Sequence, residues 1–202
     1  MTYIDIQCGF KHIKIYMFFG ILLCNKNSKK MKEPINKREY LEYQYSRLTD
    51  LDGHSALHHL TSVEKVAQKI YNTRQCKGHQ LSKLNFEYLD SDVLSDVALF
   101  HSAQQDIITT GDSYAQEYLE NWVIKNPIVV RAINYFCSGS HILPDNTDNL
   151  SDPAFHYYAI VRLADIRLHA DILQHDFVLN ESTYGKLQEL KNEYDKLIDM
   201  LK

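Results

Sequence analysis

Apolar residues recur at intervals of three or four along most of the chain from Met31 onward, and no run of alternating apolar and polar residues predicts a strand. Such intervals put apolar side chains on one face of a helix. Glycine and proline are scarce, at seven and four residues, which also favours helices. The pattern therefore predicts an all-α fold, a single helical bundle, with helices over residues 36–50, 55–71, 90–108, 114–124, 128–136, 153–177 and from Ser182 to the end.

Polar and glycine-containing stretches predict where these helices are interrupted. The stretches "RQCKGHQ" and "TTGDS" and the long polar segment "CSGSHILPDNTDNLSD" are each expected to be loops. Pro153 is expected in the first turn of a helix, where its missing N–H costs nothing. Ser182 is the expected N-cap of the last helix.

Three of these helices have a clear apolar face. The residues that we expect to be buried are Ala56, Leu60, Val63, Ala67 and Ile70 in the helix 55–71; Phe155, Ala159, Leu163, Ile166, Ala170 and Leu173 in the helix 153–177; and Leu187, Leu190, Tyr194, Leu197 and Leu201 in the last helix. The last face alternates intervals of three and four. It predicts either packing on its own domain or a short coiled-coil seam for a homodimer.

The first thirty residues differ from the rest. The apolar run "IYMFFGILLC" within them is shorter than the about 20 residues that a membrane span needs. We interpret residues 1–30 as an N-terminal extension upstream of a natural start at Met31, with residues 31–202 as the helical domain. A core strand or helix, or a signal peptide, are the alternatives for this segment.

Composition narrows the functional classes. The net charge is −4 and the pI about 6.2, so there is no strong signal for nucleic-acid binding by charge. The four cysteines are far apart and form no CxxC pair. This usage is typical of a reduced, cytoplasmic protein.

Several of the ten histidines are candidate metal ligands. His59 precedes Val63 by four residues and is expected on the same inward face, with His58 on a neighbouring face. His101 ends the apolar run "VALFH", and His141 lies in the long polar segment. Imidazoles from separate helices could therefore meet at one point.

Asp165 is the candidate carboxylate. Val161 and Leu168 flank it on its helix, so we expect it to be partly buried. A buried carboxylate needs a partner, and a metal ion is one candidate. Arg162 and His169, three and four residues away on the same helix, are the others.

Three segments, in this order, resemble the HD-domain superfamily of metal-dependent phosphohydrolases. "HLTSVEKVAQKI" is similar to the early helix in which a histidine is followed by valine and alanine, "DVALFHSAQQDI" to the helix with the name-giving His-Asp pair, and "IVRLADIRLHA" to the late helix with the last aspartate. "GDSYAQEYLENW" is a weaker match to the helix after the pair. The resemblance covers roughly residues 45–175.

The resemblance implies a set of metal ligands. His59 would be the first ligand, with His58 as the alternative register, His101 the second and Asp165 the last, while His141 would join a second metal. The implied cofactor is a divalent Mn, Fe, Co, Ni, Zn or Mg ion. The implied activity is hydrolysis of a nucleotide or another small phosphorylated substrate.

One position departs from the family's pattern. Ser102 follows His101 where the family has aspartate, and a neutral hydroxyl is a poor ligand. The alternative function is therefore a catalytically degenerate HD-like module that binds a ligand or a protein. A third hypothesis is a HEPN-type ribonuclease, because Arg162 and His169 are separated by the six residues that such enzymes allow; Arg47 and His54 share that gap.

Overall fold

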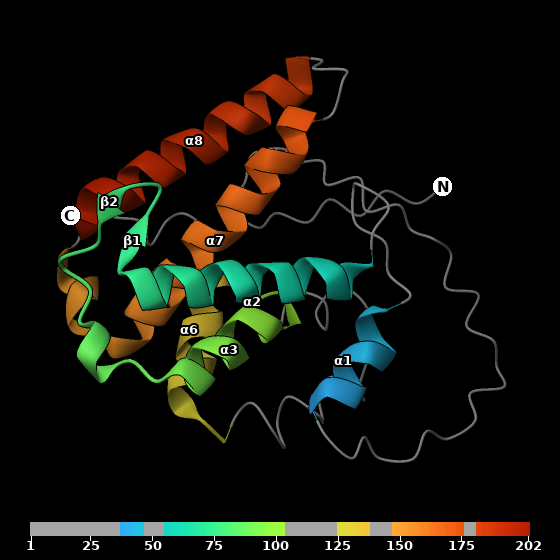
Figure 1. The fold of residues 1–202 in the computed structure, drawn as a ribbon, viewed down its shortest axis with the longest axis vertical. Helices are drawn as coiled ribbons and strands as arrows, with labels where there is room; N and C mark the ends of the chain where they lie inside the picture. Colours follow the sequence, from blue (N-terminus) through green and yellow to red (C-terminus); the bar gives the residue numbers. More distant parts are fainter. Residues whose placement is uncertain (1–36, 47–54, 104–124, 138–146, 176–180) are drawn as a thin grey trace, which may run out of the picture.

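The computed structural model describes residues 37–46, 55–103, 125–137, 147–175 and 181–202, and this part of the chain is mostly helical (Figure 1). Its six α-helices are α1 (Lys37–Tyr45), α2 (Ala56–Thr73), α3 (Ser91–Phe100), α6 (Pro127–Cys137), α7 (Pro153–His175) and α8 (Glu181–Leu201). Short 3-10 turns lie at η1 (Phe86–Tyr88) and η4 (Thr147–Ser151). The predicted all-α class is confirmed. None of the described helices combines the length and the apolar character needed to cross a membrane.

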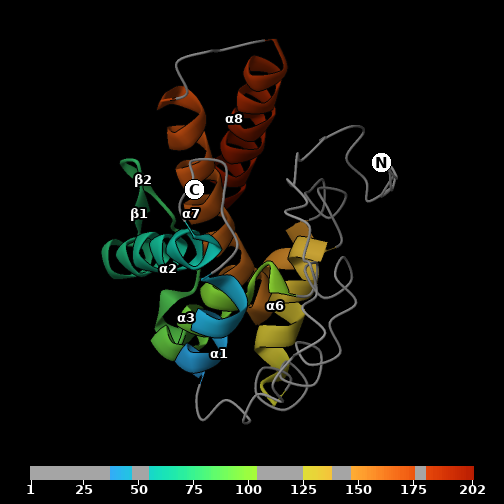
Figure 2. The same cartoon turned by 90° about the vertical axis from the view of Figure 1, so that its right-hand side faces the viewer.

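Helix α7 is the centre of the structure. It packs against α2, α3, α6 and α8. In Figure 2, α8 and the second half of α7 lie above α2, while α1, α3 and α6 lie below it. From Ala154 to Ile166, every residue of α7 except Arg162 is buried. The sequence predicted that only one face of this helix is buried. That prediction was wrong for this part of α7, because neighbouring helices cover it on all sides.

Side-chain caps explain where two helices begin. The Ser55 hydroxyl accepts the backbone N–H of His58 at 3.2 Å and starts α2. The Asp90 carboxylate accepts the N–H groups of Asp92 and Val93 and starts α3. Each cap satisfies backbone donors that the first turn of a helix leaves unpaired.

The same kind of contact orders the start of α7. Asp152 accepts the N–H of Ala154 at 3.0 Å, and Pro153 is the first helical residue, as the sequence predicts. The predicted start of the last helix was slightly wrong, because α8 begins at Glu181 and Ser182 lies inside it.

The stretch predicted as a loop after α2 contains a small antiparallel hairpin, which corrects that prediction. Strands β1 (Gln75–Cys76) and β2 (His79–Gln80) pair in the register Gln75 with Gln80. Lys77 and Gly78, at its tip, have φ values of 46° and 83°. Two consecutive positive φ values are typical of the tight turns that join short strands. The hairpin lies beside the C-terminal half of α8 (Figure 1).

Helix α8 covers one side of α7. Its apolar face follows the predicted spacing, with Leu197 and Leu201 buried and Leu190 and Tyr194 partly buried against the core. The Lys83 N–H donates to the Leu201 carbonyl at 3.1 Å, which fixes the end of the helix. This face therefore packs within its own chain. The homodimer stays a prediction.

Several predictions concern residues outside the described part of the chain. These are the N-terminal extension 1–30, the helix 114–124 and the second half of the predicted helix 90–108. Within the described residues, α3 ends at Phe100, and His101 is its C-cap.

Candidate metal centre

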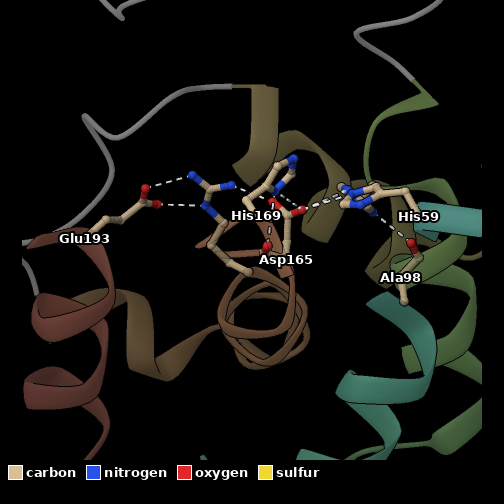
Figure 3. Close-up of polar contacts among 7 residues, drawn as sticks. His59, Ala98, Asp165, His169 and Glu193 are labelled. Carbon is tan, nitrogen blue, oxygen red and sulfur yellow. Dashed lines mark hydrogen bonds and ion pairs between the residues drawn. The ribbon is translucent and has the colours of Figure 1, made fainter. Parts of the chain in front are cut away.

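Three separate helices bring the predicted ligands together (Figure 3). His59 lies in the first turn of α2, His101 caps the end of α3, and Asp165 lies in the middle of α7. One candidate ligand atom from each of these residues lies within 4.8 Å of the other two. Among the described residues, no other group of three or more His, Cys, Asp or Glu side chains converges in this way.

The convergence is centred on the Oδ1 atom of Asp165. The Nε2 atoms of His59 and His101 lie 3.2 and 3.8 Å from it, and Nδ1 of His169 lies 3.0 Å from it. The Asp165 side chain is only 4% exposed. None of these contacts is aligned as a hydrogen bond, so Oδ1 is buried without a hydrogen-bond partner among the residues that the structure describes. Because an unsatisfied buried carboxylate oxygen is costly, this atom fits a metal ligand.

His101 is held in a form suited to binding a cation. Its Nδ1 lies 2.7 Å from the Ala98 carbonyl oxygen, which can only accept, so Nδ1 carries the proton. The Nε2 lone pair is thereby left facing Asp165. Burial lowers the pKa of His101, which favours the neutral imidazole. A backbone carbonyl that fixes the tautomer in this way is a common partner of metal-binding histidines.

The charges around Asp165 favour its ionised form. Burial by itself raises the pKa of the Asp165 carboxyl, but the positive charge of His169 and the contact with His59 lower it by more, so the pKa lies well below its usual range. The same Asp165 charge raises the pKa of His169. His169 is a partly exposed residue at the edge of the cluster, 38% accessible in its side chain. The centre therefore contains an anionic oxygen surrounded by imidazoles.

An ion-pair chain occupies the opposite side of the carboxylate. Arg162 Nη1 donates to Asp165 Oδ2 at 2.6 Å, while its Nε and Nη2 donate to the two carboxylate oxygens of Glu193 on α8, each at 2.7 Å (Figure 3). Burial lowers the pKa of Arg162, but the hydrogen bonds with Glu193 and the charge of Asp165 raise it by more, so the guanidinium stays charged. The sequence left open whether Asp165 contacts Arg162 and His169 on its own helix or histidines from other helices. In the structure it contacts both groups.

The other residues considered as metal ligands are not part of this cluster in the described structure. His58 is exposed, and it is His59 whose nitrogen reaches Asp165. His141 lies outside the described residues. Ser102 is partly buried directly after His101 and brings a hydroxyl where a carboxylate was expected.

Sequence reasoning missed Glu193 entirely. It lies 31 residues from Arg162 on another helix, and no local pattern connects the two. Phe136, whose ring centroid is 5.2 Å from that of His101, was also missed. His169 was considered only as a partner of Asp165 on its own helix or as a ribonuclease residue. Its position four residues after Asp165 was the signal that could have placed it near the ligands.

Comparison with known proteins does not assign a family. No family model, curated protein or solved structure matches the chain. The donor set itself is informative, since two imidazoles and one carboxylate are used by zinc and iron sites. The fold and this cluster define the class as a helical protein with a candidate divalent-metal centre.

Proposed function

We propose that this protein is a metal-dependent phosphohydrolase of the HD type, acting on a nucleotide or another small phosphoester. The observation that carries the proposal is the buried Asp165 Oδ1. It has no hydrogen-bond partner within the described part of the chain, and His59 and His101 approach it from two other helices. The order of these three residues along the chain is the order that the resemblance to the HD superfamily implies.

In this proposal each residue of the cluster has a distinct role. His59, His101 and Asp165 would hold the cation, and Arg162 and Glu193 would position the Asp165 carboxylate. A divalent cation bound there would supply a water of lowered pKa and polarise a phosphoryl oxygen. The fixed tautomer of His101 keeps one lone pair available without any rearrangement.

The ligand set limits which cation fits. Imidazole suits Zn, Fe, Co and Ni, whereas Mg prefers an all-oxygen environment. Ser102 removes the carboxylate that would balance a second metal ion. We therefore propose a single cation, with Zn or Fe ahead of Mn and Mg.

A second candidate function has its own support. Arg162 offsets part of the Asp165 charge through a 2.6 Å hydrogen bond, and Ser102 adds no negative charge. A centre with this little net negative charge fits a degenerate HD-like module that binds a ligand or a protein without catalysis. The two candidates differ in whether the purified protein holds a metal.

Metal analysis with a phosphoester panel tests the proposal. We expect about one equivalent of Zn or Fe per chain after dialysis, and hydrolysis of at least one nucleotide or small phosphoester when that metal is supplied. Both should be lost in His59→Ala and kept in His58→Ala, its matched control on the exposed side of α2. Wild-type protein that binds no metal and hydrolyses nothing would contradict the proposal.

The Ser102→Asp variant then distinguishes the two candidates. If the wild-type centre is inactive but Ser102→Asp acquires metal binding, the degenerate module is supported. If the wild-type protein already binds metal and acts, the added carboxylate should raise metal affinity about tenfold, because it better balances the cation's charge.

A further inference from the structure

A groove of about 450 Å³ lies between α7, α8 and the tip of the β1–β2 hairpin. Its lining combines cations, tyrosines and aliphatic side chains. The lining includes Lys77, Arg167, Tyr184, Leu190, Lys191 and Tyr194. A volume in this range is typical of pockets that bind small molecules.

The groove is electropositive. Lys77, Arg167 and Lys191 line it, with Asp195 as the one acidic residue among the lining side chains that the structure describes. Arg167 is partly buried, and no carboxylate of the described residues lies within ion-pair distance of it. A partly buried guanidinium without a carboxylate is a ready site for an anion.

Two tyrosines give the groove a surface for a flat ring. Tyr184 is 63% exposed near the start of α8. The Tyr194 hydroxyl donates to the Cys76 sulfur at 3.4 Å, and the Lys77 ammonium lies 5.6 Å from the centre of the Tyr194 ring. These contacts place Tyr194 and one cation next to each other beside the hairpin. Aromatic side chains of this kind stack on nucleobases.

The groove is separate from the metal centre. Arg167 follows Asp165 by two residues on α7, which corresponds to a rotation of about 200° around a helix, so the two side chains leave on opposite sides. On α8, the adjacent residues Glu193 and Tyr194 also have different neighbours, since Glu193 reaches Arg162 and Tyr194 lines the groove. Occupation of the groove therefore needs neither the metal nor its ligands.

We propose that this groove binds a nucleoside phosphate, with the base against Tyr184 and the aliphatic side chains and the phosphates among Lys77, Arg167 and Lys191. An anion alone would use the cations but leave the exposed tyrosine and the aliphatic lining in water. A neutral aromatic compound would leave the Arg167 charge unbalanced. A ligand with both a planar ring and a phosphate uses the whole lining.

Titration calorimetry of the full chain with ADP tests this binding, with EDTA present to remove metal. We expect ADP to bind at least about tenfold more tightly than adenosine or inorganic phosphate, because only ADP engages both parts of the groove. Lys191→Glu and Tyr184→Ala should each weaken ADP binding about tenfold or more. Both residues are exposed, so these variants are expected to fold.

Matched controls make the result specific. Lys65→Glu makes the same charge change on an exposed site of α2, and Tyr88→Ala removes another exposed tyrosine; both should leave ADP affinity unchanged. Absence of ADP binding, or binding that is insensitive to Lys191→Glu and Tyr184→Ala, would overturn the inference. So would phosphate binding as tightly as ADP. ADP binding that is lost with EDTA or in Asp165→Asn but kept in Lys191→Glu would assign the nucleotide to the metal centre instead.

Discussion

The two oxygens of Asp165 lie in environments that differ in how complete their hydrogen bonding is. On the Oδ2 side, Arg162 donates at 2.6 Å and is itself held by the two hydrogen bonds that it donates to Glu193. On the Oδ1 side, nitrogens of three histidines approach to between 3.0 and 3.8 Å, yet none makes an aligned hydrogen bond. Oδ2 therefore belongs to a fully hydrogen-bonded ion-pair chain, whereas Oδ1 is surrounded by side chains that could act as metal ligands.

This difference indicates that the Oδ2 side of Asp165 contributes to stability and that the Oδ1 side serves metal binding. A bidentate arginine–carboxylate pair fixes geometry and joins α7 to α8. The imidazoles of His59 and His101, which make no aligned hydrogen bond to Oδ1, can instead bind a cation. Substitutions on the ion-pair side should therefore act mainly on stability, and substitutions on the histidine side mainly on metal binding.

The largest effect is expected from Asp165→Asn, which removes the charge that both sides share. We expect a loss of about 3 kcal/mol in the free energy of unfolding, because Arg162 loses a buried partner, and a fall of at least about 100-fold in zinc affinity. Urea unfolding and zinc titration measure the two effects. Asp171→Asn makes the same change farther along α7 and should alter neither. An Asp165→Asn protein that keeps zinc would show that this carboxylate is not a ligand.

Glu193→Gln should separate stability from metal binding. The Arg162 guanidinium then keeps only one carboxylate, and we expect a loss of about 2 kcal/mol, below the value for fully buried pairs because both side chains retain some exposure. Zinc affinity should change less than about threefold, since Asp165 stays in place. Glu189→Gln, at an exposed site of α8, is the control for urea unfolding. An equal loss of zinc affinity in Glu193→Gln and Asp165→Asn would mean that the two sides are not separable.

His59→Gln should act in the opposite way. It removes an imidazole from the Oδ1 side, so zinc affinity should fall at least about tenfold while the free energy of unfolding changes by less than about 1 kcal/mol. His58→Gln, the adjacent exposed residue, should leave zinc affinity unchanged in the same titration. A result in which His58→Gln has the larger effect would favour the alternative register.

The smallest effect concerns pH. The Asp165 charge raises the pKa of His169 above its ordinary 6.5, so protonated His169 stabilises the fold fully below that pH and less as the pH rises through the raised pKa. His169→Gln should therefore destabilise the metal-free protein more at a pH of about 5.5 than at about 8.5. Urea midpoints at the two pH values measure this, with the exposed His79→Gln as control. A difference that grows toward alkaline pH would show that His169 is not held by Asp165.

Local features of the fold could be predicted from the sequence because their causes are local. The starts of α2 and α7 follow from Ser55 and Pro153, and the apolar spacing of α2 matches its buried face. The hairpin was missed because its two-residue strands have no periodicity, although Lys77-Gly78 was a turn signal. The burial of α7 on every side also escaped prediction, since a helix surrounded by neighbours has no polar face to contrast with an apolar one.

By itself, the sequence determined that the chain is helical, that His59 and Asp165 belong to inward-facing positions, and that His101 ends an apolar helix. It left open whether Asp165 pairs with Arg162, with His169 or with a group on another helix. Only the tertiary structure decided that all three kinds of partner are present. Arg162 binds one oxygen of the carboxylate, and His169 and the histidines of α2 and α3 surround the other. The physical reason is that partners such as Glu193 and His59 come from distant parts of the chain, and packing around α7 sets which of them meet.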